Sequence, residues 1–219
     1  MDWRFIAQYA GLYVEAAGLT AGIALIGIAG AAAAGFLCSI IRFYRIPVLR
    51  RFAGGYVELS RNTPLLIQLF FLYFGLPKAG IVLSAKACAI AGLVFLGGGY
   101  MAEAFRSGLE AVAGIQEESA LSLGLRNWQV FWFVLLPQAA AIAVPAFGAN
   151  VIFLLKETSV FSVVALADLM HVAKDLIGLY YKTDEALLML AAAYFILLAP
   201  VSAGFTWLER RFRYAGIGN

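Results

Sequence analysis

The chain has 219 residues, of which 63% are hydrophobic and only 13% are charged. Soluble domains carry about 25% charged residues, so this composition excludes an ordinary soluble domain and favours an integral membrane protein. The net charge of +3 is too small to indicate a nucleic-acid partner. The length suits one bundle of about five spanning helices, at roughly 20 apolar residues each, and leaves no room for a separate soluble domain.

Five apolar stretches are the predicted spans of this all-α membrane protein. The first is rich in Ala and Gly, which suits close helix packing in lipid. The second is interrupted by Glu58, Arg61 and Pro64, and the fourth apolar run is divided by Pro137 and Pro145. The spans are predicted at residues 17–41, 56–76, 86–106, 137–156 and 186–208.

The positions of the arginines predict the orientation. If five spans alternate from an outside N-terminus, ten of the eleven arginines fall on the cytoplasmic side. Basic residues concentrate on that side of membrane proteins. The sequence therefore predicts a multi-pass protein with the N-terminus outside and the C-terminus in the cytoplasm.

Two other features of the sequence bear on chemistry. The outer connection 157–185 contains a short apolar run, Val160–Met170, which is too short to span and is expected to form a re-entrant or interfacial helix. The two cysteines, Cys38 and Cys88, lie inside apolar runs, so they indicate buried small side chains rather than a disulfide or a metal site.

The most informative stretch is residues 111–137, on the predicted cytoplasmic side. It reads Glu118-Ser119-Ala120-Leu121-Ser122-Leu123-Gly124, then nine residues, then Val134-Leu135-Leu136-Pro137. This spacing resembles the EAA loop of the permeases of ATP-binding-cassette (ABC) importers, with Ser119 in place of the second Ala and Val134 in place of Ile.

The residue types in this stretch agree with the resemblance. Residues 111–123 are mostly good helix formers, and Gly124 stands where a helix would end. Asn127 is expected to cap the next helix, and Pro137 to sharpen the bend into the fourth span. By resemblance, the helix docks in a groove of the ATPase. The resemblance assigns this coupling to Glu117, Glu118, Ser119, Ala120, Leu123, Gly124 and Pro137.

Three further blocks resemble the polar amino acid branch of these permeases, the histidine, glutamine, arginine and cystine type. They are residues 58–77, with Asn62 where the family usually has Gly, residues 100–108 and residues 155–160. The resemblance implies a type I (MetI-like) importer fold and a path for a polar amino acid. It also implies three partners: an ABC ATPase, a second permease chain that is identical or homologous, and an external solute-binding protein.

The chain itself is expected to be a transport subunit and not an enzyme. It has no Gly-x4-Gly-Lys-Ser/Thr loop for nucleotide phosphates, so ATP and magnesium are expected on the partner ATPase and no cofactor on this chain. Gly97, Gly98 and Gly99 lie inside a span without a Lys, which indicates a packing or hinge feature.

Ionisable groups at membrane depth are usually functional, and Arg61 and Glu103 are the main candidates for the substrate path. Arg61 can hold a substrate carboxylate with its guanidinium fork, or it can face the cytosol. Glu103 can receive an ammonium group, or it can pair with Arg106 three residues later. The lesser candidates are Thr63, Gln68, Tyr100, Asn150 and Glu157.

Some alternatives stay open from sequence alone. Asn150 either bonds a neighbouring helix or lines the path, and Glu157 with Thr158 and Ser159 forms either an outer gate or a helix cap. A stand-alone secondary transporter or channel is the alternative function; it would need a coupled-ion site that the charge-poor spans do not offer. The amino acid carried is not specified by the sequence.

Overall fold

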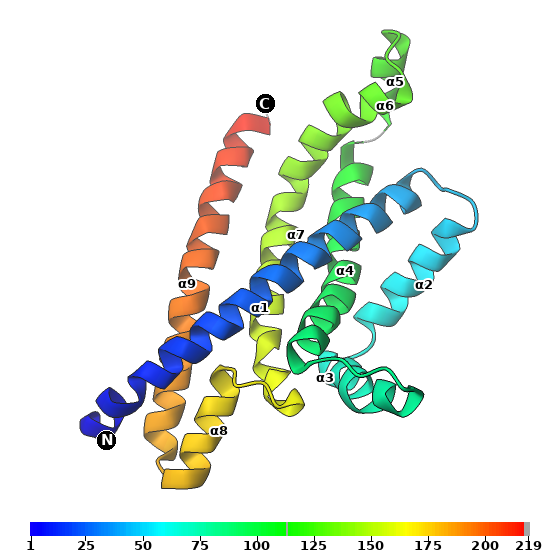
Figure 1. Ribbon diagram of the computed structural model, residues 1–219. Helices are drawn as coiled ribbons and strands as arrows, with labels where there is room; N and C mark the ends of the chain where they lie inside the picture. Colours follow the sequence, from blue (N-terminus) through cyan, green and yellow to red (C-terminus); the bar gives the residue numbers. More distant parts are fainter. Residues whose placement is uncertain (113, 217–219) are drawn as a thin grey trace.

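The computed structural model describes residues 1–112 and 114–216, and its regular elements are all helical. Figure 1 shows a bundle in which α4, α7 and α9 run side by side while α1 crosses them diagonally. The N-terminus and α8 lie at one end of the bundle, and α5 and the C-terminal end of α9 lie at the other. The elements in chain order are α1 Trp3–Phe43, α2 Leu49–Arg61, α3 Leu65–Phe70, η1 Phe71–Gly75, η2 Leu76–Ala79, α4 Ala85–Val112, α5 Ile115–Ser122, α6 Asn127–Gln129, η3 Val130–Leu135, α7 Leu136–Glu157, η4 Thr158–Val164, α8 Leu169–Tyr180 and α9 Thr183–Gly216.

Within the described ranges, four helical segments are long and apolar enough to cross a membrane. They correspond to the predicted first, third, fourth and fifth spans. The predicted second span, residues 56–76, is not one continuous helix: α2 ends at Arg61 and α3 begins at Leu65. Pro64 causes the break, because it lacks an N–H and disfavours helical geometry in the residue before it.

Helix α1 is longer than the predicted first span. It begins at Trp3 rather than near residue 17, and the Asp2 side chain accepts a hydrogen bond from the Phe5 N–H at 3.1 Å. A helix of 41 residues is about 60 Å long, roughly twice the thickness of a bilayer core. Figure 1 shows α1 running diagonally across the bundle, and a tilted helix crosses a bilayer over a longer path than an upright one.

The connection between α7 and α9 differs from the prediction. Residues 158–164 form a 3-10 turn, and the helix of this connection is α8, which begins only at Leu169. The apolar run Val160–Met170 is therefore helical only in part: it ends the 3-10 segment and enters the first residues of α8. The Asp168 side chain fixes the start of α8 by accepting the His171 N–H at 3.1 Å, whereas Glu157 makes no side-chain cap.

The core is built where α1, α4 and α7 approach one another. Leu93, Met101 and Leu154 are almost fully buried there. The glycines of α4 allow close packing: a Cβ at Gly99 would lie 2.0 Å from the Ser60 hydroxyl oxygen of α2. The run Gly97–Gly99 is therefore a packing feature, because it lets α2 and α7 lie directly against α4.

We expect Gly99→Ala to destabilise the protein, because the new methyl group would force α2 away from α4. Overpacking of this kind costs about 1–3 kcal/mol, which should appear as a lower Tm of the detergent-purified protein. Gly54→Ala in α2 is the matched control, since a Cβ there meets no atom within 4 Å. An unchanged Tm for Gly99→Ala would contradict the close α2–α4 contact.

Candidate functional site

The predicted coupling segment projects from the bundle as the short helix α5 (Figure 1). Two glycines with positive φ enclose it: Gly114, at φ 98°, precedes the helix, and Gly124, at φ 84°, follows it. Side chains other than glycine rarely adopt such angles. The helix is shorter than predicted, since α4 continues to Val112 and α5 starts at Ile115; Ala113 lies outside the described residues.

The end of α5 is a Schellman motif. The Gly124 N–H donates to the Leu121 carbonyl at 2.9 Å, and the Leu125 N–H donates to the Ala120 carbonyl at 3.3 Å, which satisfies two carbonyls at the helix end. The expected cap at Asn127 is wrong, because Arg126 holds the N-cap position of the next helix. There the Gln129 side chain accepts the Arg126 backbone N–H at 2.9 Å.

The residues assigned to coupling do not share one face. Glu118, Ser119, Leu123 and Gly124 are exposed, and Leu123 is 84% exposed. Glu117 is half-buried. Ala120 is buried, 5% exposed, in a cluster with apolar residues of α4 and η3. Ala120 therefore anchors α5 to its own bundle, and the exposed residues form the surface available to a partner.

Pro137 lies at the start of α7, directly after a π-helical segment. Residues 130–135 form a π-helical segment that joins α6 to α7, so Asn127–Val164 reads as one continuous helical segment. Pro137 has no N–H to offer the preceding turn, and a π-bulge is a common way to accommodate such a defect inside a helix. Pro137 itself is exposed.

The break between α2 and α3 is stabilised by the Gln68 side chain. In an unbroken helix the Ser60 carbonyl would accept from residue 64, but Pro64 has no N–H. The Gln68 Nε2 instead donates to the carbonyls of Ser60, at 3.2 Å, and Thr63, at 2.9 Å. Thr63 Oγ1 in turn donates to the Leu59 carbonyl at 2.8 Å. Gln68 and Thr63 thus hold the broken segment in place.

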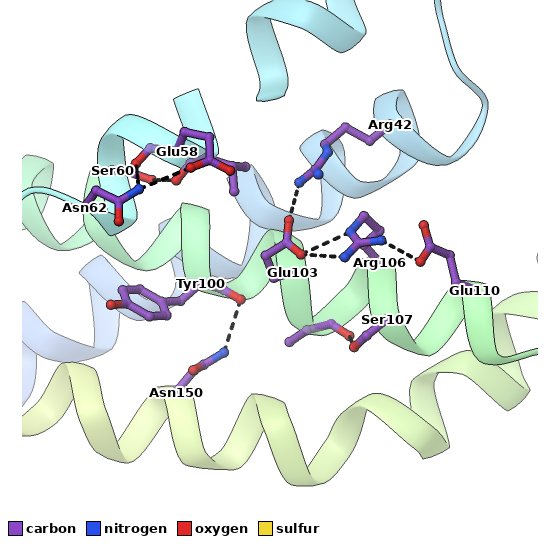
Figure 2. A network of polar contacts seen from close by, with 12 residues as sticks. Arg42, Glu58, Ser60, Asn62, Tyr100, Glu103, Arg106, Ser107, Glu110 and Asn150 are labelled. Carbon is purple, nitrogen blue, oxygen red and sulfur yellow. Dashed lines mark hydrogen bonds and ion pairs between the residues drawn. The ribbon is translucent and has the colours of Figure 1, made fainter. Parts of the chain in front are cut away.

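Three of the predicted path residues come together beside this break. The Arg61 guanidinium lies 5.3 Å from the centre of the Tyr100 ring, a cation–π contact. Asn150 of α7 donates to the Tyr100 carbonyl at 3.2 Å, so it bonds a neighbouring helix (Figure 2). The Arg61 side chain remains exposed, with a guanidinium that can receive a carboxylate.

Glu103 does not join this group, because its carboxylate is held by two arginines (Figure 2). One oxygen accepts from Arg42 of α1 and the other from Arg106 of α4, at 2.7 and 3.0 Å from the Arg106 nitrogens. Of the two alternatives for Glu103, the structure shows the pairing with Arg106. Sequence reasoning missed Arg42, whose only signal was its position at the end of the first apolar run.

Glu157 is the last residue of α7, where it is half-buried, and the η4 segment that follows it packs against α3. The neighbouring Thr158 hydroxyl donates to the Leu155 carbonyl at 2.7 Å and lies 3.2 Å from the Tyr194 hydroxyl. Among the described residues, no group of three or more His, Cys, Asp or Glu side chains could hold a metal ion.

In sequence, the chain matches one family model and several of its curated relatives. The family model described as "binding-protein-dependent transport system inner membrane component" matches residues 17–214. The chain is 33% identical to the probable glutamine ABC transporter permease protein GlnM of Bacillus subtilis, covering 85% of this chain and 87% of that protein. It is 29% identical to the glutamine transport system permease protein GlnP of Escherichia coli K12, covering 97% and 98%.

Solved structures agree with the sequence matches. The fold matches a chain of the crystal structure of an amino acid ABC transporter with histidines, with a TM-score of 0.89, 29% identity, and coverage of 96% of this chain and 99% of that chain. A chain of the MetNI methionine ABC transporter matches with a TM-score of 0.71 at 17% identity over 90% and 96%, which shows the shared fold.

The family match covers nearly the whole chain, and it includes both the exposed α5 and the broken α2–α3 segment. The chain therefore belongs to the family of binding-protein-dependent transport system inner membrane components, the permease subunits of ABC importers.

Proposed function

We propose that this chain forms the translocation path for a polar amino acid across the bacterial inner membrane, driven by ATP hydrolysis on a separate subunit. The observation that carries the proposal is α5, a short helix with exposed residues held between two positive-φ glycines. Such a helix offers a rigid surface to another subunit. The amino acid substrate is supported by relatives whose names specify glutamine or amino acids.

The partners follow from the same proposal. An ABC ATPase, carrying ATP and magnesium, would dock on the exposed residues of α5. A second permease chain, identical or homologous, would complete the path, and an external solute-binding protein would deliver the amino acid. The family description, which names binding-protein-dependent transport, supports the last of these partners.

The orientation belongs to the proposal as well: N-terminus outside and C-terminus in the cytoplasm. Its support is the distribution of charge over the two ends of the bundle. The end with α5 also carries the α1–α2 connection with Arg45 and the start of α2 with Arg50 and Arg51. The start of α9, at the opposite end, carries Asp184 and Glu185 (Figure 1). Excess Arg on one side marks that side as cytoplasmic.

Within the path, Arg61 would bind the carboxylate of the amino acid. Its guanidinium is exposed, and the Tyr100 ring holds it from one side. Thr63, Gln68 and Asn150 would shape this part of the path by fixing the helix break and the Tyr100 backbone. Glu103 is engaged by arginines, so we do not place it against the carboxylate, whereas Glu157, at the end of α7, stays a candidate for the path.

The function can be tested with the chain tagged and purified from its host under mild detergent. An ATPase subunit should co-purify, and the reconstituted complex should accumulate radiolabelled glutamine, or another polar amino acid of a panel, only when the solute-binding protein and ATP are supplied on opposite sides. Uptake by the permease chain alone, driven by an ion gradient, would instead support a stand-alone transporter.

Arg61→Ala should raise the apparent KM for the amino acid by about tenfold or more, since a hydrogen bond to a charged group is worth about 1.5–3 kcal/mol. The amount of co-purified ATPase should not change, because Arg61 ends α2, and that end of α2, next to α3, lies away from α5 in Figure 1. Arg50→Ala, which removes another exposed arginine, is the control. Normal transport kinetics for Arg61→Ala would make Arg61 a structural residue.

A further inference from the structure

Helices α1 and α4 pack together so closely that they form a single unit. A Cβ added at Gly35 of α1 would lie 2.5 Å from the Met101 Cβ and 2.7 Å from the Ala102 backbone nitrogen of α4. A Cβ at Gly27 would lie 2.8 Å from the Leu93 Cβ. Backbones in this contact cannot slide past one another without separating.

At the end of the α1–α4 contact that is nearer to α5, charged side chains replace the small residues. Glu103 and Arg106 of α4 face Arg42, the basic residue in the last turn of α1. Arg106 also pairs with Glu110 at 2.5 Å, so two arginines and two glutamates alternate in one network (Figure 2). The Arg42–Glu103 pair joins two helices, whereas the other two pairs lie within α4.

The network is partly shielded from solvent. The side chains of Arg42 and Glu103 are each 23% exposed, while Glu110 is 55% exposed. Ion pairs on open surfaces contribute little, but removing one partner of a shielded pair leaves the other charge without its counter-ion. Of the two carboxylates, Glu103 pairs with two arginines and Glu110 with one. Loss of the Glu103 charge would therefore leave more charge uncompensated than loss of the Glu110 charge.

Beyond the network, the same two helices support the coupling segment. Phe36, Ile40 and Phe43 of α1 pack against the apolar cluster that includes Ala120 of α5 and Phe131. Tyr44, the residue after α1, has its ring 5.6 Å from the Phe131 ring. Displacement of α5 is therefore transmitted to the end of α1 as well as to α4.

We infer that the Arg42–Glu103 pair is a positioning clasp that keeps the ends of α1 and α4 together, so that a movement imposed on α5 moves both helices as one body. The inference rests on the proposed function, in which an ATPase moves α5. Without the clasp, the end of α1 would be tied to α4 and α5 by apolar contacts alone, and ATP hydrolysis would be coupled less tightly to transport.

The test compares Glu103→Gln with Glu110→Gln in the complete complex with its ATPase, reconstituted in liposomes. Both variants remove one carboxylate charge from the same network and the same helix, but Glu110 does not contact α1. The measured quantity is the amount of amino acid imported per ATP hydrolysed. We expect Glu103→Gln to lower this ratio about fivefold or more, the lower end of common coupling effects, and Glu110→Gln to leave it unchanged.

Arg42 variants supply the second arm. Arg42→Lys keeps the charge and should keep the ratio, because only the Nη1 atom of Arg42 contacts Glu103. Arg42→Gln should lower the ratio as Glu103→Gln does, and the double variant should be no worse than the single ones, since the two residues act as a pair. The clasp would be overturned if the losses in the import-to-ATP ratio of the two single variants added up in the double variant. It would also be overturned if Glu103→Gln complexes kept the wild-type ratio, including complexes that assemble poorly.

A distance measurement separates this inference from the proposed function. Spin labels at Arg45→Cys, two residues beyond the end of α1, and Ser107→Cys in α4, both exposed positions, report the separation of the α1 end from α4 in a background without Cys38 and Cys88. We expect Glu103→Gln to broaden the distance distribution and Glu110→Gln to leave it narrow, whatever solute is carried. Equal distributions would overturn the clasp, while a wild-type complex that imports no amino acid would overturn only the proposed function.

Discussion

Gly124→Asp should abolish ATP-driven import while leaving the protein in the membrane. Gly124 adopts φ 84°, and a Cβ built there meets no atom of this chain within 4 Å. The chain can therefore tolerate the side chain apart from the cost of the left-handed backbone, about 1–2 kcal/mol. The new carboxylate would stand beside the exposed Leu123, on the surface proposed to dock the ATPase, where it would be buried without a partner.

The measurement is uptake in proteoliposomes together with the amount of permease in the membrane fraction and the amount of co-purified ATPase. We expect uptake to fall to background and co-purified ATPase to fall by about tenfold or more, equivalent to 1.4 kcal/mol of docking energy. Gly80→Asp is the matched control, since Gly80 also has φ 84° and open space around it but lies before α4, far from α5. Unchanged uptake in Gly124→Asp, or an equal loss in Gly80→Asp, would contradict the assignment of α5 to coupling.

The short helix α5 and its glycine end could be predicted from sequence because their determinants are local. A glycine at the helix end and the spacing to Pro137 are visible in the chain itself, and Gly124 does close α5 with positive φ. What sequence reasoning missed is the direction of each side chain. Ala120 faces its own bundle, and that depends on how α5 packs against α4 and η3 rather than on the motif.

The contacts of the candidate path residues were harder to predict, because they join residues far apart in the chain. Glu103 was expected either to bind substrate or to pair with Arg106, and its second partner, Arg42, lies 61 residues away. Arg61 and Tyr100 likewise meet only because α2 packs on α4. Pro64 could be recognised as an interruption, but the Gln68 side chain that replaces the lost backbone bonds required the fold.

The start of α8 shows a third limit of sequence reasoning. Hydrophobicity favoured a helix over residues 160–170, yet the helix begins at Leu169, where a polar residue, Asp168, provides the cap. Asp168 is fully buried, and its second carboxylate oxygen, Oδ2, has no hydrogen-bond partner among the described residues. Sequence alone did not identify Asp168 as the cap, because a buried carboxyl group is an unusual cap and its burial depends on the packing around it.

Asp168→Asn should stabilise the protein at neutral pH. Burial raises the pKa of Asp168 to about 6, although backbone N–H groups and the nearby His171 oppose the shift. Because the folded state binds its proton more tightly than the unfolded state, with an ordinary pKa of 3.8, stability from this group is complete below about pH 4 and is lost as pH rises through about 6. Asn is an equally good cap and carries no charge.

The experiment follows the Tm of detergent-purified wild type and Asp168→Asn between pH 4 and pH 8. Two pKa units correspond to about 3 kcal/mol, and about 2–4 °C of Tm accompanies each kcal/mol for a chain of this size. The variant should therefore gain several degrees over wild type at pH 7.5 and little at pH 4. A difference in Tm that does not change with pH would show that the Asp168 carboxyl does not titrate in this range. A wild type that is more stable than the variant at pH 7.5 would show that the ionised carboxylate has found a partner, which the orphaned Oδ2 oxygen argues against.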